Sequence, residues 1–188
     1  MQYTEGQIGR VFVVRIDDGE DMLLSLRQFI NDKSVCAGSI LFLGALMNGR
    51  MVTGPEEPVI PPVPHFVIFE GGWEVFGVGT IYPGEGGPHI HYHASVGRSG
   101  HALTGCLREK AISYLIVEAV ILEFTGLSAR RELDQKTQLH LPVLGKEEDI
   151  HDEDKNLNAG EREDESGKNE STDEMDEIIR DLTRGSYS

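Results

Sequence analysis

The sequence predicts an α+β fold in which a mostly antiparallel β-sheet packs with one main amphipathic helix. One early segment has apolar residues at helical spacing, and many later segments are rich in β-branched and aromatic residues and separated by glycine-rich turns. The shortage of apolar residues in this 188-residue chain falls almost wholly beyond residue 144. We therefore predict one domain over residues 6–145 and a disordered acidic tail over residues 146–188.

The first two elements follow from local patterns. Residues 9–16, G-R-V-F-V-V-R-I, precede the turn signal D-D-G at 17–19 and are expected to form a strand. A helix is expected to begin near Asp21 and to end at the polar run 31–33. The apolar residues that predict its buried face are Met22, Leu23, Leu26, Phe29 and Ile30.

The rest of the domain is expected to consist of strands and turns. Segment 55–64 holds five prolines and is therefore predicted to be a loop. Trp73 and Phe76 lie among glycines and valines that suit a core strand, so we expect both aromatic side chains in the core. The expected strands are 40–46, 49–53, 65–69, 73–81, 88–96, 102–107 and 114–124.

The most informative stretch is 86–109, which predicts a hairpin with its turn at 97–101. Alternate residues of a strand share a face, so His89, His91 and His93 point one way and the apolar residues between them point to the core. If residues 98–101 form the loop, residues whose numbers sum to 199 face each other, and Cys106 falls opposite His93. In this register His101, in the turn, points away from the other histidines.

Imidazole nitrogens and a thiolate converging on one face suit a metal ion. The candidate ligands are His91, His93, Cys106 and His89, and the ion expected is divalent, most readily zinc, with iron, nickel and copper also compatible. Three protein ligands would leave a position for water or substrate, whereas four would close the site. The alternative is a polar strand that faces solvent without binding a metal.

Three further segments, together with this hairpin, resemble the plant and prokaryote conserved (PPC) domain family. Plant AT-hook proteins carry this domain beside their DNA-binding hooks, and bacteria and archaea carry it alone. The resemblance covers roughly residues 6–145. Its segments are G-R-V-F-V-V-R-I-D-D-G-E-D at 9–21, A-G-S-I-L-F-L-G-A-L at 37–46, W-E-V-F-G-V-G-T-I at 73–81 and T-G-C-L-R-E at 104–109.

The resemblance implies a homotrimer with a metal held near subunit boundaries. In prokaryotic members an H-x-H pair and a third histidine, in a G-G-H motif on the following strand, hold the metal. The pair corresponds here either to His89 with His91 or to His91 with His93. The third position corresponds to Cys106, where T-G-C replaces G-G-H, and a thiolate favours zinc or a softer ion.

Two functions of different kinds are compatible with these residues. The first is a trimeric metal-binding protein that acts on or senses a small anionic molecule, with Arg108 and Arg98 as candidate anion-binding residues. The second is a regulatory module that binds DNA or protein, with a structural metal and a tail that recruits a protein partner. Whether the protein is an enzyme stays open.

Charge and composition restrict partners and location. The net charge is −15, and residues 1–145 alone hold 16 acidic and 11 basic residues. The sequence also lacks the R-G-R-P core of an AT-hook. Direct binding to nucleic acid is therefore not expected. No apolar run is long enough for a membrane span. Two cysteines are too few for a disulfide framework, so we expect a cytoplasmic protein. Near 172–183 the tail has helical periodicity that could fold against a protein partner.

Overall fold

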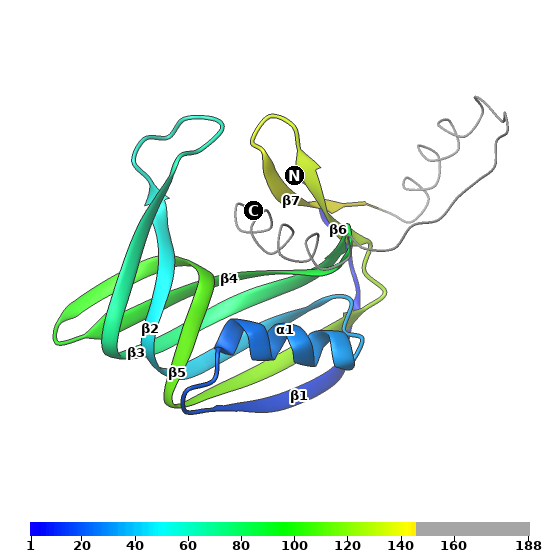
Figure 1. Cartoon of the computed structure of the whole chain (residues 1–188). Helices are drawn as coiled ribbons and strands as arrows, with labels where there is room; N and C mark the ends of the chain where they lie inside the picture. The colour runs from blue at the N-terminus through cyan, green and yellow to red at the C-terminus, as the bar shows by residue number, and fades with distance from the viewer. Residues whose placement is uncertain (146–188) are drawn as a thin grey trace, which may run out of the picture.

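The computed structural model describes residues 1–145, and these form one twisted antiparallel sheet, one helix and a small separate hairpin (Figure 1). The expected fold class is confirmed. The predicted tail at 146–188 and its helix near 172–183 lie outside the described residues. The elements are β1 (Gln7–Asp17), α1 (Met22–Asp32), β2 (Gly38–Pro55), β3 (Pro64–Gly84), β4 (Gly87–Arg98), β5 (His101–Thr125), β6 (Ala129–Asp134) and β7 (Leu139–Leu144).

The helix begins and ends where the sequence predicts. Asp21 caps its first turn, because its carboxylate accepts hydrogen bonds from the backbone N–H groups of Leu23 and Leu24. The chain leaves it at Lys33, whose backbone N–H donates to the carbonyl of Phe29. The buried side of α1 joins the core of the sheet, and Phe29 packs at the edge of that core. The fully or nearly buried helix residues are Met22, Leu23, Leu26 and Ile30.

Several predicted strands are continuous in the structure. The segments expected at 40–46 and 49–53 are both parts of β2, those at 65–69 and 73–81 are parts of β3, and those at 102–107 and 114–124 are parts of β5. The pairing register of β2 shifts at 46–48, so an irregularity bends the strand without ending it. The proline-rich segment 55–64 lies mostly between β2 and β3, at the tip of the arm that these two strands form (Figure 1).

The sheet order is β1-β5-β2-β3-β4, and β4 also pairs with β5. The long β5 makes this closure, because its first part pairs with β4 and its later part pairs with β2 and β1. The β6–β7 hairpin, which we did not predict from the sequence, packs beside β3. Helix α1 covers one face of the sheet (Figure 1), and no helix in the described part of the chain is long and apolar enough to cross a membrane.

The face of the sheet opposite α1 carries a row of residues that we call the outer row. Each member lies directly opposite the next on the neighbouring strand, so all share a face. The apolar members Val13, Leu41 and Val78 are 79%, 49% and 44% exposed. In order across the strands, the row is Val13, Val120, Leu41, Val78, His93 and Cys106.

Phe76 lies next to this row, and the prediction that it is a core residue is wrong. It is 68% exposed and faces away from the helix, opposite Leu43 of β2, which is also exposed. Trp73 is partly buried against the core, as expected, and its indole N–H donates to the carbonyl of Glu70. The glycines of this segment lie on the buried face of the strand. Phe76 lies on the outer face, because side chains alternate along a strand.

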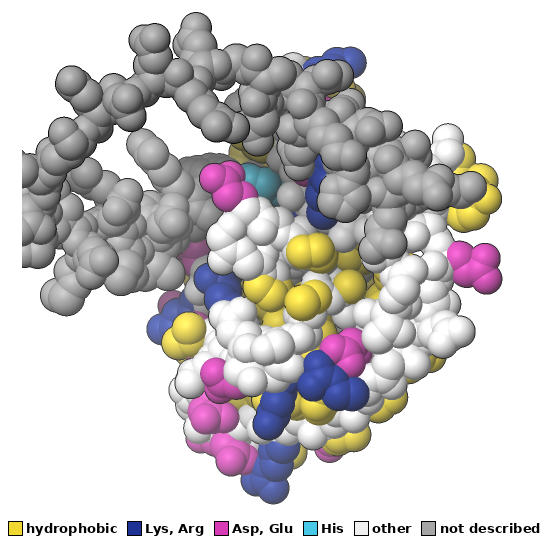
Figure 2. All heavy atoms as spheres, turned by 90° about the vertical axis from the view of Figure 1, so that its right-hand side faces the viewer, with side chains coloured by type: hydrophobic (Ala, Val, Ile, Leu, Met, Phe, Trp, Pro, Cys, Tyr) yellow, Lys and Arg dark blue, Asp and Glu magenta, His cyan; other side chains and the backbone are white. Residues whose placement is uncertain are grey.

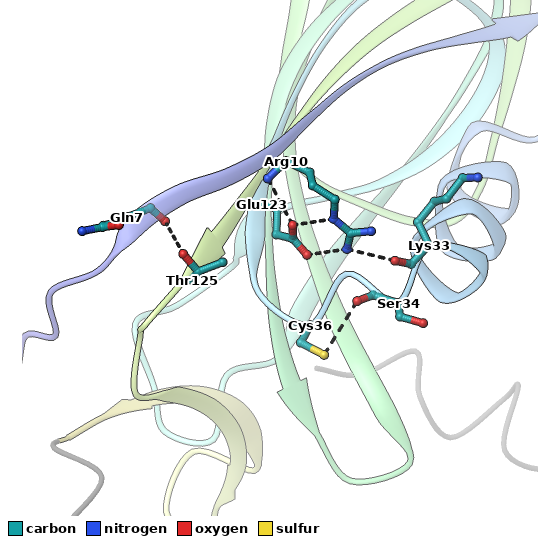
Figure 3. Close-up of polar contacts among 7 residues, drawn as sticks. All are labelled: Gln7, Arg10, Lys33, Ser34, Cys36, Glu123 and Thr125. Atoms are coloured by element: carbon teal, nitrogen blue, oxygen red, sulfur yellow. Dashed lines mark hydrogen bonds and ion pairs between the residues drawn. The ribbon is translucent and has the colours of Figure 1, made fainter.

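Arg10 connects three elements (Figure 3). Its side chain donates to both carboxylate oxygens of Glu123 on β5, at 2.7 and 2.5 Å, and to the carbonyl of Lys33 after α1, at 3.0 Å. Its backbone N–H also donates to Glu123. These contacts stabilise the carboxylate and lower the pKa of Glu123 to about 2.

The Glu123 contacts are expected to contribute to stability in a defined range of pH. Because the pKa of Glu123 is lower in the folded protein, the contribution is complete above the ordinary value of 4.5 and is lost as the pH falls towards 2. A Glu123→Gln variant should therefore have a lower Tm than wild type at pH 7 and the same Tm near pH 2. Thermal unfolding across this range tests the prediction, with the exposed Glu74→Gln as a control for loss of one charge; an unchanged Tm difference at all pH values would contradict it.

Candidate metal centre

The structure confirms the predicted register of the histidine hairpin. His93 lies opposite Cys106 and Gly97 lies opposite Ala102, so paired residues sum to 199 as expected. The loop is shorter than predicted, because Arg98 and His101 also pair and only Ser99 and Gly100 remain between the strands. Both loop residues have positive φ, 50° and 81°, as a two-residue hairpin turn requires.

Three side chains converge on the outer face of this hairpin. The Cys106 Sγ atom lies 2.8 Å from Nε2 of His93 and 3.1 Å from Nε2 of His91. The ligand atoms of the three residues all lie within 4.8 Å of one another. The centroids of the two imidazole rings are 4.9 Å apart and the ring planes are nearly perpendicular, so their nitrogens approach the sulfur from two directions.

A close approach of backbones positions Cys106. A Cβ atom on the preceding residue, Gly105, would lie 2.0 Å from the carbonyl oxygen of Val52, so only glycine lets β2 and β5 come this near. Val52 also lies opposite Cys106, which is therefore held between β2 and β4.

The charge states of these residues favour metal binding by neutral imidazoles. Burial, followed by the positive charges of Arg131 and Arg108, lowers the pKa of His91 to about 4. Burial and Arg108 likewise lower the pKa of His93. Both rings are therefore neutral near pH 7, with a nitrogen lone pair available for a cation. Burial raises the pKa of the Cys106 thiol, and Arg108 opposes this shift by its charge and a hydrogen bond.

Comparison with known proteins identifies the domain. The sequence profile of the Plants and Prokaryotes Conserved (PCC) domain matches residues 3–125, more than half of the chain. The chain belongs to this family. The expected resemblance is thereby confirmed, and the three converging side chains all lie inside the matched range. A search of curated proteins gave no match.

Solved structures share the fold of this PCC domain. A protein of Archaeoglobus fulgidus described as metal-containing is 23% identical, with a TM-score of 0.67 over 76% of this chain and 99% of its own. A plant- and prokaryote-conserved protein of Pyrococcus horikoshii is 21% identical, with a TM-score of 0.67 over 77% and 99%. A protein of Bacteroides thetaiotaomicron described as a candidate DNA-binding protein is 24% identical, with a TM-score of 0.61 over 77% and 98%.

His89 lies apart from the three converging residues of the PCC domain. Its Nε2 atom is 2.9 Å from the backbone carbonyl of Glu85, and its ring packs 5.1 Å from that of His140 on β7. The pairing of β4 with β5 runs only as far as His93 and Cys106. Of the two histidine pairs left open by the sequence, the structure brings His91 and His93 to the thiol.

The two predicted anion-binding arginines occupy different places. Arg108 follows Cys106 by two residues on β5, and its charge acts on both His93 and Cys106. Arg98 lies at the other end of β4 and donates to the carbonyl of Glu70 at 3.0 Å. It lies five positions along the strand from His93, about 17 Å away.

Sequence reasoning missed Arg131 and His140. Both lie on the unpredicted β6–β7 hairpin, and the Arg131 side chain donates to the hydroxyl of Thr80, which lies opposite His91. The R-R pair at 130–131 gave a local basic signal, but nothing in the sequence places it beside a strand fifty residues earlier.

Proposed function

We propose that this PCC-domain protein is a homotrimer that binds a divalent metal ion, zinc, through His91, His93 and Cys106, and that the ion takes a small anionic molecule. One observation carries the proposal: three potential ligand atoms from two strands lie within 4.8 Å of one another.

The geometry fits zinc after small side-chain rotations. With zinc bonds of about 2.0–2.1 Å to nitrogen and 2.3 Å to sulfur, tetrahedral ligands lie roughly 3.5 Å apart. The sulfur is 2.8 and 3.1 Å from the two nitrogens, so these two pairs must open by about 0.7 and 0.4 Å. Two neutral imidazoles and one thiolate form a donor set of intermediate softness, which suits zinc.

A zinc ion with three protein ligands keeps a fourth position for water or another ligand. Arg108 brings a positive charge near these ligands, because its charge acts on both Cys106 and His93. The ion and the guanidinium together favour an anionic ligand. A metal with an open position can polarise a carbonyl group or activate water, so the same arrangement would support catalysis.

The outer row supports assembly. Large apolar side chains lie exposed on β1, β2 and β3, with the half-buried Val120 of β5 between them, and such surfaces on soluble domains usually mark interfaces. The row ends at His93 and Cys106, so an interface on this face would lie against the metal ligands. This agrees with the trimer and the boundary site that membership of the family led us to expect.

DNA binding receives less support. The described residues carry five more acidic than basic side chains, and the face in Figure 2 has Asp and Glu interspersed with Lys and Arg. Non-specific binding to phosphates needs a surplus of positive charge. The Bacteroides protein, described as a candidate DNA-binding protein, shares the fold at 24% identity, which does not transfer that role.

Titration of the metal-free full chain with Co²⁺ and Zn²⁺ tests the proposal. We expect one ion per chain, displacement of Co²⁺ by Zn²⁺, and a sulfur-to-cobalt charge-transfer band that reports the Cys106 thiolate. Native molar mass on the same samples reports the trimer. Absence of saturable binding would exclude the metal site, and a monomeric mass at micromolar concentration would exclude the trimer.

A further inference from the structure

Arg131 is a buried cation on the β6–β7 hairpin. Its residue is 9% exposed, and its guanidinium donates to the His140 carbonyl at 2.9 Å and to the Thr80 hydroxyl at 3.0 Å. The ring of Tyr82 lies beneath it, with the guanidinium carbon 5.9 Å from the ring centroid. Its Nε atom is buried and has no hydrogen-bond partner among the described residues. All three observed partners are uncharged.

A buried guanidinium normally has an anion beside it, because burial of an unpaired charge is costly. No carboxylate of residues 1–145 lies within 4.0 Å of Arg131. Within residues 1–145, the Arg131 guanidinium is therefore not paired with any carboxylate. A metal at Cys106 would add further positive charge.

A cavity of about 380 Å³ opens beside Arg131. This is a volume typical of sites for small organic molecules. Two acidic residues also line it: Glu132 is already paired with Arg130, and Glu85 makes no ion pair with Arg131. A second buried atom without a partner, Nδ1 of His140, belongs to another residue of the lining. The lining consists of Pro83, Gly84, Glu85, Arg130, Arg131, Glu132, Leu133 and His140.

The cavity and the metal ligands lie on neighbouring elements. Arg131 contacts Thr80, Thr80 lies opposite His91 on the next strand, and Arg131 lies close enough to His91 to affect its charge state. One small molecule lying along this side of the sheet would thus have the guanidinium on one side and the metal ligands on the other.

We infer that Arg131 and its cavity bind the oxyanion group, carboxylate or phosphate, of a small molecule. A guanidinium fork matches two oxygens of such a group, and three of the five N–H groups of Arg131 have no acceptor among residues 1–145. The inference deepens the proposed small anionic ligand and rests on that part of the proposed function. It does not require that the metal be bound.

Calorimetric titration of the full chain, metal-free and zinc-loaded, with inorganic phosphate and with acetate tests this inference and tells the two oxyanions apart. Wild type should bind at least one of them, and Arg131→Met should weaken that binding by about 10-fold or more. Arg27→Met, an exposed position on α1, removes the same charge and should change little.

A second pair of variants avoids disturbing the buried Arg131. Leu133→Glu places a carboxylate at the lining of the cavity, at a residue that is 46% exposed, and should weaken anion binding several-fold by like-charge repulsion. Leu141→Glu, on the neighbouring strand and 38% exposed, is the matched control.

The outcomes separate this inference from the metal site. Binding to metal-free protein that is lost in Arg131→Met and Leu133→Glu supports the inference even if zinc does not bind. Binding that needs zinc and is unaffected by both variants places the anion on the metal alone and overturns it. Absence of phosphate and acetate binding in both forms of wild type also overturns it.

Discussion

A Cys106→Ala variant is expected to lose tight zinc binding, with an affinity at least about 100-fold below that of wild type. Cys106 supplies the only sulfur among the three converging residues, and its Sγ is the atom nearest to both imidazole nitrogens. Without it, two histidines remain, and two nitrogens on one strand cannot complete a tetrahedral site. Competition with a chromophoric chelator measures the affinity directly.

Matched controls locate the effect. Cys36→Ala removes the other thiol, which is exposed after α1 and donates to the Ser34 carbonyl at 3.9 Å, and should leave zinc binding intact. His93→Ala should lose affinity, whereas His101→Ala, on the same hairpin but outside the cluster, should not. His89→Ala should retain zinc, because its ring contacts Glu85 and His140 instead. Equal zinc affinity in Cys106→Ala and wild type would contradict the site.

A charge in the outer row is expected to separate the proposed trimer into monomers. Leu41 lies in the middle of the row, and Leu41→Asp would place a carboxylate in an apolar interface without a partner. Burial of an unpaired charge costs more free energy than most single contacts contribute, so the monomer should dominate at micromolar concentration. Sedimentation velocity or native mass spectrometry measures the change.

Leu24→Asp provides the control for this prediction. Leu24 is 63% exposed, more than Leu41, but it lies on α1, on the opposite side of the sheet from the outer row. It should leave the trimer intact. Leu41 is separated from His93 by one strand, β3, so zinc binding by the Leu41→Asp monomer shows whether one chain holds the metal alone. A trimeric Leu41→Asp protein would exclude the outer row as the interface.

Local patterns predicted the helix and the hairpin well because both depend on neighbouring residues. The cap at Asp21 and the spacing of the apolar residues determine α1. Alternation along β4 and one short turn determine which residues of β5 face His93, and so the pairing with Cys106 followed from the numbering alone. The loop is two residues shorter than expected, but the register is the same, because Arg98 and His101 form one additional pair.

Exposure of Phe76 and continuity of the long strands did not follow from the sequence. An apolar strand residue has the same local pattern whether it faces the core or another subunit, so periodicity cannot separate the two. The breaks expected within β2, β3 and β5 are bends of single strands, which glycines and register shifts allow.

By itself, the sequence determined the fold class, the helix, the register of the histidine hairpin and the set of candidate metal ligands. These depend on short-range periodicity and one turn. The tertiary structure alone decided that His89 turns towards β7, that the candidate metal ligands end a row of exposed apolar side chains, and that Arg131 lies beside Thr80. Each of these depends on how strands far apart in the chain pack together. Such long-range contacts produce no periodic pattern in the sequence.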